Sequence, residues 1–485
     1  MKSKLEVIKN ILSKEYFFFL LSFLILSIAS SIRHYWFQSS SWDLGIFDQA
    51  IYLISQGQEP YSSLLGFHIL GDHGALVLYP LGFLNKYFPS TYFLFFIQSF
   101  ALSVSIFPLY KLSKNLNLSK LSTSASYVAF LLYPIVFNVN IFDFHPEVLA
   151  FPIVLDIFIS LKINKIEPLG KFFLKVFFIL TCKITNSFLV FGFGVWFFFK
   201  GFLRIGISLI SFSLFWFFSV AFVLIPHFGG ENASLIRQAE KFGISTNTDF
   251  NIFSLIKIGY QLFLQLFSVC NLEYLLLLVI PVLYIFLNKN RFYFFSNIIP
   301  FLPILILNLL SDSYPMKDLV HQYSLFIVPF LAVSIQESLS PILVQGILNY
   351  PKWFQFRAPF LIIFWSVLTF IIFSRFTFFF GPFHKHFASL DARREAISLI
   401  KKSSSVLTNN DLVPHLSRRK YIKFTDSREE YNLENFDEIL LDREIPGFQS
   451  NHLYIDNIYK YLESTNNWEK VYEKNFIVLF KKLNS

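Results

Sequence analysis

Two carboxylates stand in the first polar stretch after the apolar segment near the N-terminus. The stretch reads SSWDLGIFDQAIYLISQGQEP and places Asp43 and Asp48 five positions apart. In a helix this spacing separates the two side chains by about 140°, so they do not share one face. One interpretation is that Asp43 caps a helix on the membrane surface and that Asp48 lies within it. The other is that an acid here accepts the proton of a hydroxyl group as that hydroxyl attacks a substrate.

A second polar cluster is GDHGA at residues 71–75, with His68 close by in the sequence. Small residues flank Asp72 and His73 and allow the backbone to turn tightly before the next apolar run. A solvated turn explains this pattern, and a histidine that faces a substrate explains it as well.

A third cluster, NIFDFHPE at residues 140–147, separates two apolar segments. Asp143, His145 and Glu147 occupy alternating positions, and Pro146 restricts the turn. A loop this short keeps all three side chains near the lipid headgroups. Ionisable groups are costly there unless they are hydrated or paired, which favours a functional role over an ordinary loop.

The fourth cluster is SDSYPMKDLVHQYS at residues 311–324, where Lys317, His321 and Tyr323 lead into an apolar segment. Lys183 adds a base inside CKITN, at residues 182–186, which interrupts a long apolar run. A lysine within the membrane can extend its ammonium group to the surface. Its place at a helix break instead favours a phosphate or carboxylate partner.

Together these groups would surround an outward-facing cavity at the lipid boundary. Transfer of a group from a lipid-anchored donor needs this arrangement, because the tail of the donor remains in the bilayer. A carboxylate accepts the proton of the attacking hydroxyl, and a cation neutralises the departing phosphate. The same side chains could hold a divalent cation through Asp43, Asp143, His145 or Glu147, and no spacing selects or excludes this option.

The composition is that of a membrane protein. The chain has 485 residues, of which 54% are hydrophobic and 15% charged, whereas soluble proteins carry about 25% charged residues. The net charge of +9 indicates basic loops between apolar runs and not a nucleic-acid partner. With only two cysteines, a disulfide framework or a thiolate metal site is not expected.

Apolar runs long enough to span a bilayer recur along the chain. They predict an all-helical membrane domain of roughly eleven transmembrane helices. Strong candidates are 16–32, 91–110, 121–138, 202–226, 293–310, 324–340 and 358–378, and shorter ones are 147–161 and 273–287. The run 171–199 is expected to form two short helices that meet at CKITN, and 75–89 to form a short helix that does not cross.

The distribution of bases gives the orientation, because cytoplasmic loops are rich in Lys and Arg. With the N-terminus in the cytoplasm, the inner loops carry most of the bases, among them Lys111, Lys114, Lys120, Lys162, Lys165, Lys171, Lys175, Lys200, Arg204, Lys289 and Arg291. The polar clusters described above then lie outside. The C-terminus is expected outside as well.

The composition changes near residue 384 to that of a soluble domain. Residues 391–404 and 451–465 have helical spacing, 405–410, 421–424 and 438–442 are strand-like, and 468–482 suggests a closing hairpin. We therefore expect a multi-pass domain over 1–380, with a catalytic-type first outer loop at 33–90. A small α/β domain on the outer face would occupy 381–485.

Several motifs resemble a family of predicted bacterial and archaeal membrane proteins, domain of unknown function 2079. They are WDLGIFDQA, FPLYKL, LLYPIVFNVNIFDFHPEVLAFP and SVLTNNDLVPHLSRRKYIKF, and they cover nearly the whole chain. The family is similar to the GT-C glycosyltransferases, which use polyprenyl-phosphate sugars and often carry a catalytic Asp in the first outer loop. The resemblance gives that role to Asp43, with Asp48 second, and places Lys183 and the FDFHPE residues in the site.

The resemblance implies an integral glycosyltransferase of the inner membrane that serves the cell envelope. It would transfer sugar from a polyprenyl-phosphate donor to an extracytoplasmic glycan, lipid or protein. The candidate catalytic residues are Asp43 and Asp48. The candidate substrate-binding residues are His73, Asp143, His145, Glu147, Lys183, His321 and Tyr323.

One position departs from the family pattern. At the broken helix the family typically has Lys followed by an acid, and here Lys183 is followed by Ile184. This change favours an alternative, in which the chain is an inactive relative that binds or scaffolds. A transporter or lipid flippase is the other alternative, although the sequence shows no repeated halves.

Overall fold

The computed structural model describes residues 14–165, 167–229, 240–242, 252–342 and 347–483. The chain divides into two compact units. Unit 1 comprises Met1–Ile28, Leu70–Leu76 and Phe96–Thr377, and unit 2 comprises Ala29–Ile69, Val77–Phe95 and Phe378–Ser485.

Unit 1 is helical. Two of its helices, α2 and α6, also contribute residues to unit 2. The helices are α2 (Lys14–Tyr35), α4 (Leu70–His73), α6 (Tyr92–Val104), α7 (Ile106–Asn115), α8 (Lys120–Leu131), α9 (Pro134–Ile141), α10 (Phe151–Lys162), α11 (Leu169–Cys182), α12 (Asn186–Phe199), α13 (Leu203–Ser219), α14 (Ile225–Gly229), α16 (Ile252–Leu266), α17 (Val269–Val279), α18 (Arg291–Phe295), α19 (Leu302–Leu310), α20 (Val328–Ser338), α21 (Lys352–Gln355) and α22 (Ala358–Phe373).

Six helical segments in the described part of the chain are long and apolar enough to cross a membrane. They are Lys14–Tyr35, Tyr92–Asn115, Leu203–Gly229, Val269–Leu287, Arg291–Leu310 and Tyr314–Ser338, and α8 with α9 form a seventh if that bent pair is one span. The chain is therefore a helical membrane protein with several spans, as its composition predicts. The count of eleven stays a prediction.

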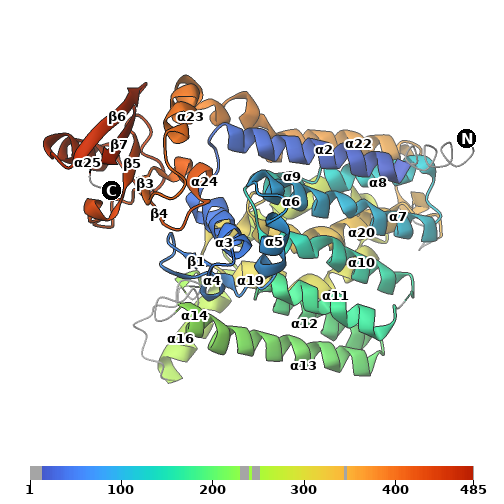
Figure 1. The fold of residues 1–485 in the computed structure, drawn as a ribbon. Coiled ribbons are helices and arrows are strands. Elements are labelled where there is room, and N and C mark those ends of the chain that lie inside the picture. The colour runs from blue at the N-terminus through green and yellow to red at the C-terminus, as the bar shows by residue number, and fades with distance from the viewer. Residues whose placement is uncertain (1–13, 166, 230–239, 243–251, 343–346, 484–485) are drawn as a thin grey trace, which may run out of the picture. The chain divides into compact units, whose positions relative to one another are not determined.

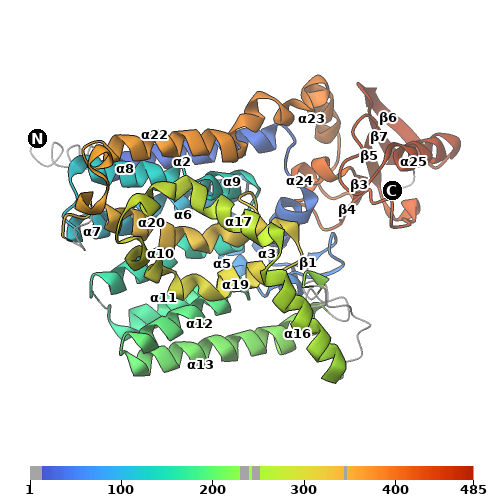
Figure 2. The ribbon, with the colours of Figure 1, turned by 180° about the vertical axis from the view of Figure 1, so that it is seen from behind.

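Helices α10 to α13 lie side by side in unit 1, as both Figure 1 and Figure 2 show. Glycines bring α12 and α13 close together. A Cβ atom on Gly194 would lie 2.8 Å from the Ile210 side chain, and one on Gly206 would lie 2.8 Å from the Phe198 backbone nitrogen. Small residues of this kind allow two membrane helices to pack backbone against backbone.

The predicted break at CKITN is confirmed. Helix α11 ends at Cys182 and α12 begins at Asn186, and Lys183 between them is extended, with φ −166° and ψ 145°. A second break separates α8 from α9, which are bent by 43°, and Pro134 begins α9 because proline fits the first position of a helix. These breaks place polar side chains where two helices end.

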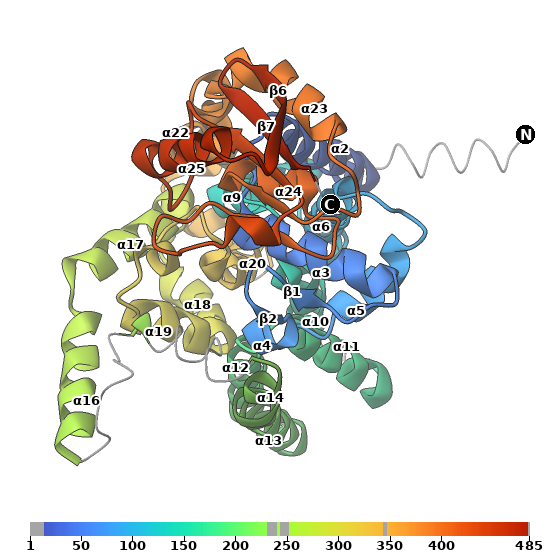
Figure 3. The same cartoon turned by 60° about the vertical axis from the view of Figure 1, so that its left-hand side comes forward.

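Unit 2 combines short helices with a five-stranded sheet, whose strands are labelled in Figure 1; Figure 3 shows two of them, β6 and β7. The elements of unit 2 are α3 (Ile46–Ser55), β1 (Tyr61–Ser62), β2 (Phe67–His68), α5 (Leu78–Asn85), α23 (Leu390–Ser398), β3 (Val406–Thr408), α24 (Val413–Leu416), β4 (Ile422–Phe424), β5 (Glu438–Asp442), α25 (His452–Ser464), β6 (Trp468–Lys474) and β7 (Ile477–Lys482). The order is β4-β3-β5-β7-β6, in which β3 runs parallel to β4 and β5 and the remaining pairs are antiparallel.

The core of the sheet forms from alternate strand residues and from the apolar face of α25. Ile439 and Leu441 on β5 and Val478 on β7 pack with Ile455 and Leu462 of α25. The helices and strands predicted after residue 390 are all observed. The short helix predicted within 75–89 is observed as α5. The domain boundary at residue 380 stays a prediction.

Candidate functional site

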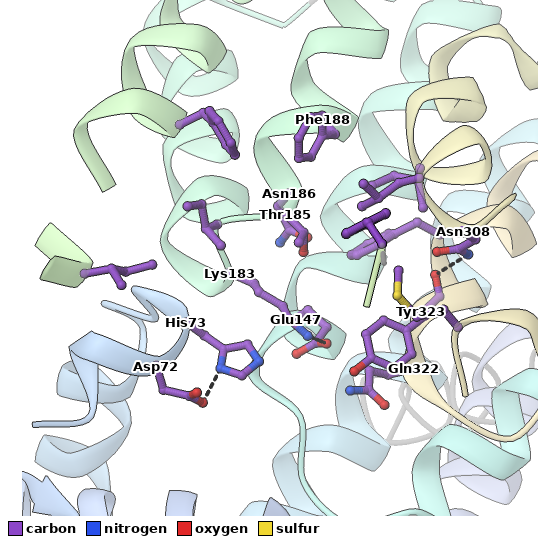
Figure 4. A pocket seen from close by; sticks show the side chains of 18 residues that line it. Asp72, His73, Glu147, Lys183, Thr185, Asn186, Phe188, Asn308, Gln322 and Tyr323 are labelled. Carbon is purple, nitrogen blue, oxygen red and sulfur yellow. Dashed lines mark hydrogen bonds and ion pairs between the residues drawn. The ribbon is translucent and has the colours of Figure 1, made fainter. Parts of the chain in front are cut away.

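A cavity of about 270 Å³ lies within unit 1. Figure 4 shows polar side chains from separate elements gathered along it, with aromatic and aliphatic groups beyond. The lining residues are Asp72, His73, Glu147, Lys183, Ile184, Thr185, Asn186, Phe188, Phe217, Ile225, Phe242, Ile304, Leu307, Asn308, Met316, Gln322, Tyr323 and Phe326. Of the candidate substrate-binding residues, His73, Glu147, Lys183 and Tyr323 meet here.

Lys183 and Glu147 form a buried ion pair at the centre of this cavity. The Lys183 Nζ atom donates to Glu147 Oε1 at 2.5 Å, and the two side chains are 7% and 5% exposed. Glu147 lies in the 3-10 turn Pro146–Ala150, directly before α10. Both charged side chains therefore project from positions next to helix ends, where the backbone is not α-helical.

His73 approaches the same pair from α4. Its ring nitrogen Nδ1 is hydrogen-bonded to the Asp72 carboxylate, and its backbone oxygen accepts from Ile184 N at 3.2 Å. Gly74 follows with φ of +61°, a conformation that favours glycine and ends the helix. The tight turn expected in GDHGA is thus observed, and it holds His73 against the helix break.

Two ammonium groups lie near the Tyr323 ring. Lys183 Nζ is 5.3 Å from the centre of this ring and Lys241 Nζ is 5.2 Å away. Lys241 also donates to the Tyr323 hydroxyl at 3.1 Å, and its backbone oxygen accepts from Asp312 N at 2.7 Å. Sequence reasoning did not select Lys241, which stands alone in its stretch of sequence without a recognisable motif.

Two more polar groups stand at this end of unit 1. Among the described residues, the buried Lys317 ammonium and the Gln322 Oε1 atom have no hydrogen-bond partner. Buried polar atoms are normally paired. An amide oxygen and an ammonium in this state could receive a hydroxyl group and an anion from a ligand.

The FDFHPE loop is held by one side chain from α6. Gln98 Nε2 donates to the Asp143 carbonyl at 2.7 Å, and Gln98 Oε1 accepts from His145 N at 2.8 Å. Asp143 has φ of +85°, a strained conformation for this residue type. The amide of Gln98 thereby fixes the loop that carries Glu147.

The same loop meets the segment 311–324 through an aromatic contact. The Phe142 ring stacks on His145 at 5.7 Å and packs edge to face with His321 at 4.5 Å. His321 Nδ1 is 2.6 Å from Asp318 Oδ2. His145, Asp143 and His321 are thus brought together next to the cavity, although none of them lines it.

Asp43 and Asp48 belong to unit 2, in the π-helical turn Ser41–Gly45 and in α3. The predicted N-cap role of Asp43 is wrong, because the Ser40 side chain caps the turn by accepting from Trp42 N. Serine fits this position because its short side chain reaches the backbone N–H groups of the first turn.

Asp48 is enclosed by donors within unit 2. Ser417 Oγ donates to its carboxylate at 2.7 Å, Thr91 Oγ1 at 3.0 Å and Arg418 Nη1 at 3.2 Å. Burial raises the pKa of Asp48, and the charge of Arg418 opposes that rise. These contacts join α3 to the segment after α24.

Within the described part of the chain, no group of three or more His, Cys, Asp or Glu side chains is arranged to hold a metal ion. The divalent cation that the sequence leaves open thus has no ligand cluster there. The charges of the cavity are arranged as pairs instead.

The fold and the cavity define a class: a membrane protein of several helical spans, with buried charges where its helices break. The chain belongs to the predicted membrane protein family DUF2079, whose model matches residues 33–479, which confirms the resemblance seen in the motifs. Its fold is similar to that of ArnT from Cupriavidus metallidurans, in a crystal structure bound to undecaprenyl phosphate. Identity is 11%, the TM-score is 0.55, and the match covers 96% of this chain and 98% of ArnT. Among curated proteins, none matches the chain.

Proposed function

We propose that the protein is a glycosyltransferase of the GT-C type in the inner membrane. It transfers a sugar from a polyprenyl-phosphate donor to an extracytoplasmic acceptor. The N-terminus is assigned to the cytoplasm and the polar clusters to the outside. The fold shared with a protein that binds undecaprenyl phosphate supports this proposal, as does the family resemblance of the motifs.

The observation that carries the proposal is the cavity built around Lys183. Its walls are mostly apolar, which suits a prenyl chain, and its polar groups include the Lys183 ammonium group, which suits a phosphate. Lys183 and Lys241 both lie near the Tyr323 ring, and Glu147 neutralises the charge of Lys183. The second carboxylate of the cavity, Asp72, is paired with His73, so the Lys241 ammonium group remains for the phosphate of a donor.

The proposed reaction is a displacement at the sugar carbon that is bonded to phosphate. The acceptor hydroxyl oxygen forms a bond to this carbon as the bond from carbon to the phosphate oxygen breaks. Asp43 takes the hydroxyl proton as general base, and polyprenyl phosphate leaves with the bonding electrons. Lys183 and Lys241 neutralise the charge that develops on it.

The other candidate residues are assigned supporting roles. His73 and Gln322 bind the hydroxyl groups of the sugar. Asp143, His145 and His321 form the rim that positions Glu147 and Tyr323. Asp48 is the second carboxylate, and it holds the helix that follows Asp43.

The experiment uses the purified full-length protein in nanodiscs with a panel of radiolabelled polyprenyl-phosphate sugars. We expect one donor to be consumed by the wild type and not by Asp43→Asn. The control is Asp391→Asn, whose carboxylate in α23 is 85% exposed. Normal transfer by Asp43→Asn removes this residue from the mechanism, and equal losses in both variants do the same.

A second function, binding without transfer, is favoured by Ile184. Its side chain lines the cavity and packs near Val220 and Ile225, at the position where the family has an acid. In that case the wild type binds the polyprenyl phosphate but consumes no donor. The same panel, measured for both binding and consumption, separates the two functions.

A further inference from the structure

Unit 1 contains a second cavity, of about 450 Å³, at the other ends of the helices that carry the candidate site. Glu147 precedes α10 and Lys183 precedes α12. The second cavity is formed where these helices end: Lys162 is the last residue of α10, and Lys200 follows the last residue of α12. With a rise of 1.5 Å per residue, the 14 residues of α12 separate the two cavities by about 20 Å. The lining residues are Leu161, Lys162, Asn164, Trp196, Phe197, Lys200, Phe202, Tyr293 and Glu337.

The floor of this cavity is a buried and balanced polar cluster. Lys162 Nζ lies 2.7 Å from Glu337 Oε1, and Glu337 is 1% exposed. Asn297 joins the pair, because its Oδ1 accepts from Lys162 at 2.7 Å and its Nδ2 donates to Glu337 Oε2 at 2.6 Å. The charges of Lys162 and Glu337 cancel each other. The remaining charge among the lining residues is that of Lys200.

Lys200 carries the uncompensated charge. Within the described part of the chain its ammonium has no hydrogen bond or ion pair, and it lies 5.9 Å from the centre of the Trp196 ring. Tyr293 and Phe202 complete an aromatic wall. Trp and Tyr side chains of this kind are enriched at the level of the lipid headgroups.

The charge around the cavity favours an anion. The carbonyl groups at the ends of α10, α12 and α20 carry partial negative charges, equivalent to about half a charge per helix that fades within one turn. The positive charges outnumber these partial charges, because Lys165 and Arg291 stand within two residues of lining groups and add to the charge of Lys200. The positive-inside rule assigns this end of the bundle to the cytoplasm.

We propose that this cavity binds the phosphate headgroup of an anionic membrane lipid, with Lys200 as its principal cation. Basic pockets between transmembrane helices bind anionic headgroups in this way. The aromatic wall covers the glycerol region, and the buried Lys162–Glu337 pair forms the floor. The site is separate from the proposed donor site and does not depend on the transfer reaction.

The test is a lipid titration of the full-length protein in detergent, followed by native mass spectrometry. The two lipids are phosphatidylglycerol and phosphatidylcholine with the same acyl chains. We expect the wild type to prefer phosphatidylglycerol by about tenfold, as a charge-assisted hydrogen bond predicts. Lys200→Gln should lose this preference, and Arg204→Gln should retain it. Arg204 is an exposed base of the same end that does not line the cavity, so it is the matched control.

Two results overturn the proposal. Equal losses in Lys200→Gln and Arg204→Gln would mean a general attraction to the basic surface. Equal retention of the two lipids by the wild type would mean that the site does not select for a headgroup with net negative charge. A third arm adds inorganic phosphate to the loaded protein. Retention of the lipid supports a lipid ligand, whereas its displacement at millimolar phosphate assigns the cavity to a soluble phosphate compound and overturns the lipid assignment.

Discussion

The Lys183 ammonium group lies 2.5 Å from the Glu147 carboxylate, and both side chains are almost completely buried. They come from two loops that are distant in sequence, one before α10 and one between α11 and α12. Charges in such a place are costly to desolvate, so the attraction within the pair offsets this cost and adds little net stability. The pair sets the charge that a ligand meets.

Removal of one member of this pair leaves the other buried without a partner. We therefore expect Lys183→Met or Glu147→Gln to lower the free energy of unfolding by about 3–5 kcal/mol. The double variant should recover part of that loss, because no isolated charge remains. Thermal unfolding in one detergent measures all three variants. A double variant whose loss equals the sum of the single losses would contradict the pairing.

An exposed ion pair in the same unit provides the control. Lys171 lies 3.3 Å from Glu167, and its side chain is 63% exposed. Lys171→Gln should change stability by less than about 1 kcal/mol, because solvent screens such pairs. A comparable loss here would point to general sensitivity of the unit to the removal of lysine.

Lys241 is predicted to matter for ligand binding more than for folding. It contributes a single hydrogen bond to Tyr323, and its charge is available to an anion. Lys241→Gln should weaken undecaprenyl phosphate binding about tenfold, with a small change in melting temperature. Lys257→Gln, a charge change on an exposed residue of α16, should leave binding unchanged. Titration of the lipid against intrinsic fluorescence measures both variants, and equal effects would refute a specific contact.

The fold was largely predictable because lipid imposes simple rules on sequence. Apolar length and the basic loops located the helices, and the proline and glycine positions marked several breaks. Helix α16 was not predicted, because Lys257 and two glutamines interrupt its apolar pattern. Strands β3 to β7 of unit 2 could be recognised as short strand-like runs and a hairpin, although β3 and β5 are buried along their whole length. The two-residue strands β1 and β2 were not predicted. The division of unit 2 from unit 1 does not follow the chain order, which no local pattern could reveal.

The candidate site was predictable in part. Ionisable residues are unusual in apolar sequence, and this contrast identified Glu147, Lys183 and His73 as candidates. Gln98 and Asn138 could not be recognised as candidates from the sequence, since a single amide side chain in a helix has no distinctive pattern. Their function depends on distant partners: Asn138 Nδ2 donates to the Leu319 carbonyl at 2.8 Å, across a long sequence separation.

Acid is expected to weaken unit 2 through His415. Burial lowers the pKa of His415 well below 6.5, and the neighbouring His34 and Arg393 lower it further. Below pH 6.5 the His415 side chain binds a proton in the unfolded chain and remains neutral in the folded chain. Stability is therefore complete above about pH 6.5 and falls as the pH decreases, by up to about 1.4 kcal/mol per pH unit for this group.

His415→Phe tests this prediction, because it removes the titrating group and keeps a ring between His34 and Phe37. The drop in melting temperature between about pH 7.5 and pH 5.5 should become smaller in this variant. His386 will preserve part of the drop, because burial lowers its pKa as well and Asp411 only partly opposes this. His452→Asn, at an exposed position, should leave the drop unchanged. An identical drop in all three proteins would exclude His415 as its source.

Asp48 and Asp43 should respond differently to the same substitution. Asp48→Asn exchanges a buried carboxylate for an amide and weakens its bonds with Ser417 and Arg418. We expect a loss of about 2–3 kcal/mol. Asp43→Asn should leave the melting temperature unchanged and abolish transfer. Thermal unfolding and donor consumption, measured on the same preparations, distinguish a structural role from a chemical one. Matching stability losses would contradict this division.

The Gln98 side-chain amide is hydrogen-bonded to the backbone of both Asp143 and His145, in the loop that carries Glu147. Gln98→Leu has a similar size but removes the donor to the Asp143 carbonyl and the acceptor for His145 N. Asp143 and His145 would then each lose one buried hydrogen bond, at a cost of about 0.5–1.5 kcal/mol each. We expect a lower melting temperature together with weaker donor binding, because Asp143 is no longer held in its strained conformation.

Gln265→Leu is the matched control for this substitution. Gln265 Nε2 makes one hydrogen bond, to the Ser311 carbonyl at 3.2 Å, in a partly buried position of α16. The loss in stability should be smaller than that of Gln98→Leu, and donor binding should remain near the wild-type value. If Gln98→Leu lowers the melting temperature but binds donor normally, the loop contributes to the fold alone. In that case Asp143 and His145 would be removed from the proposed site.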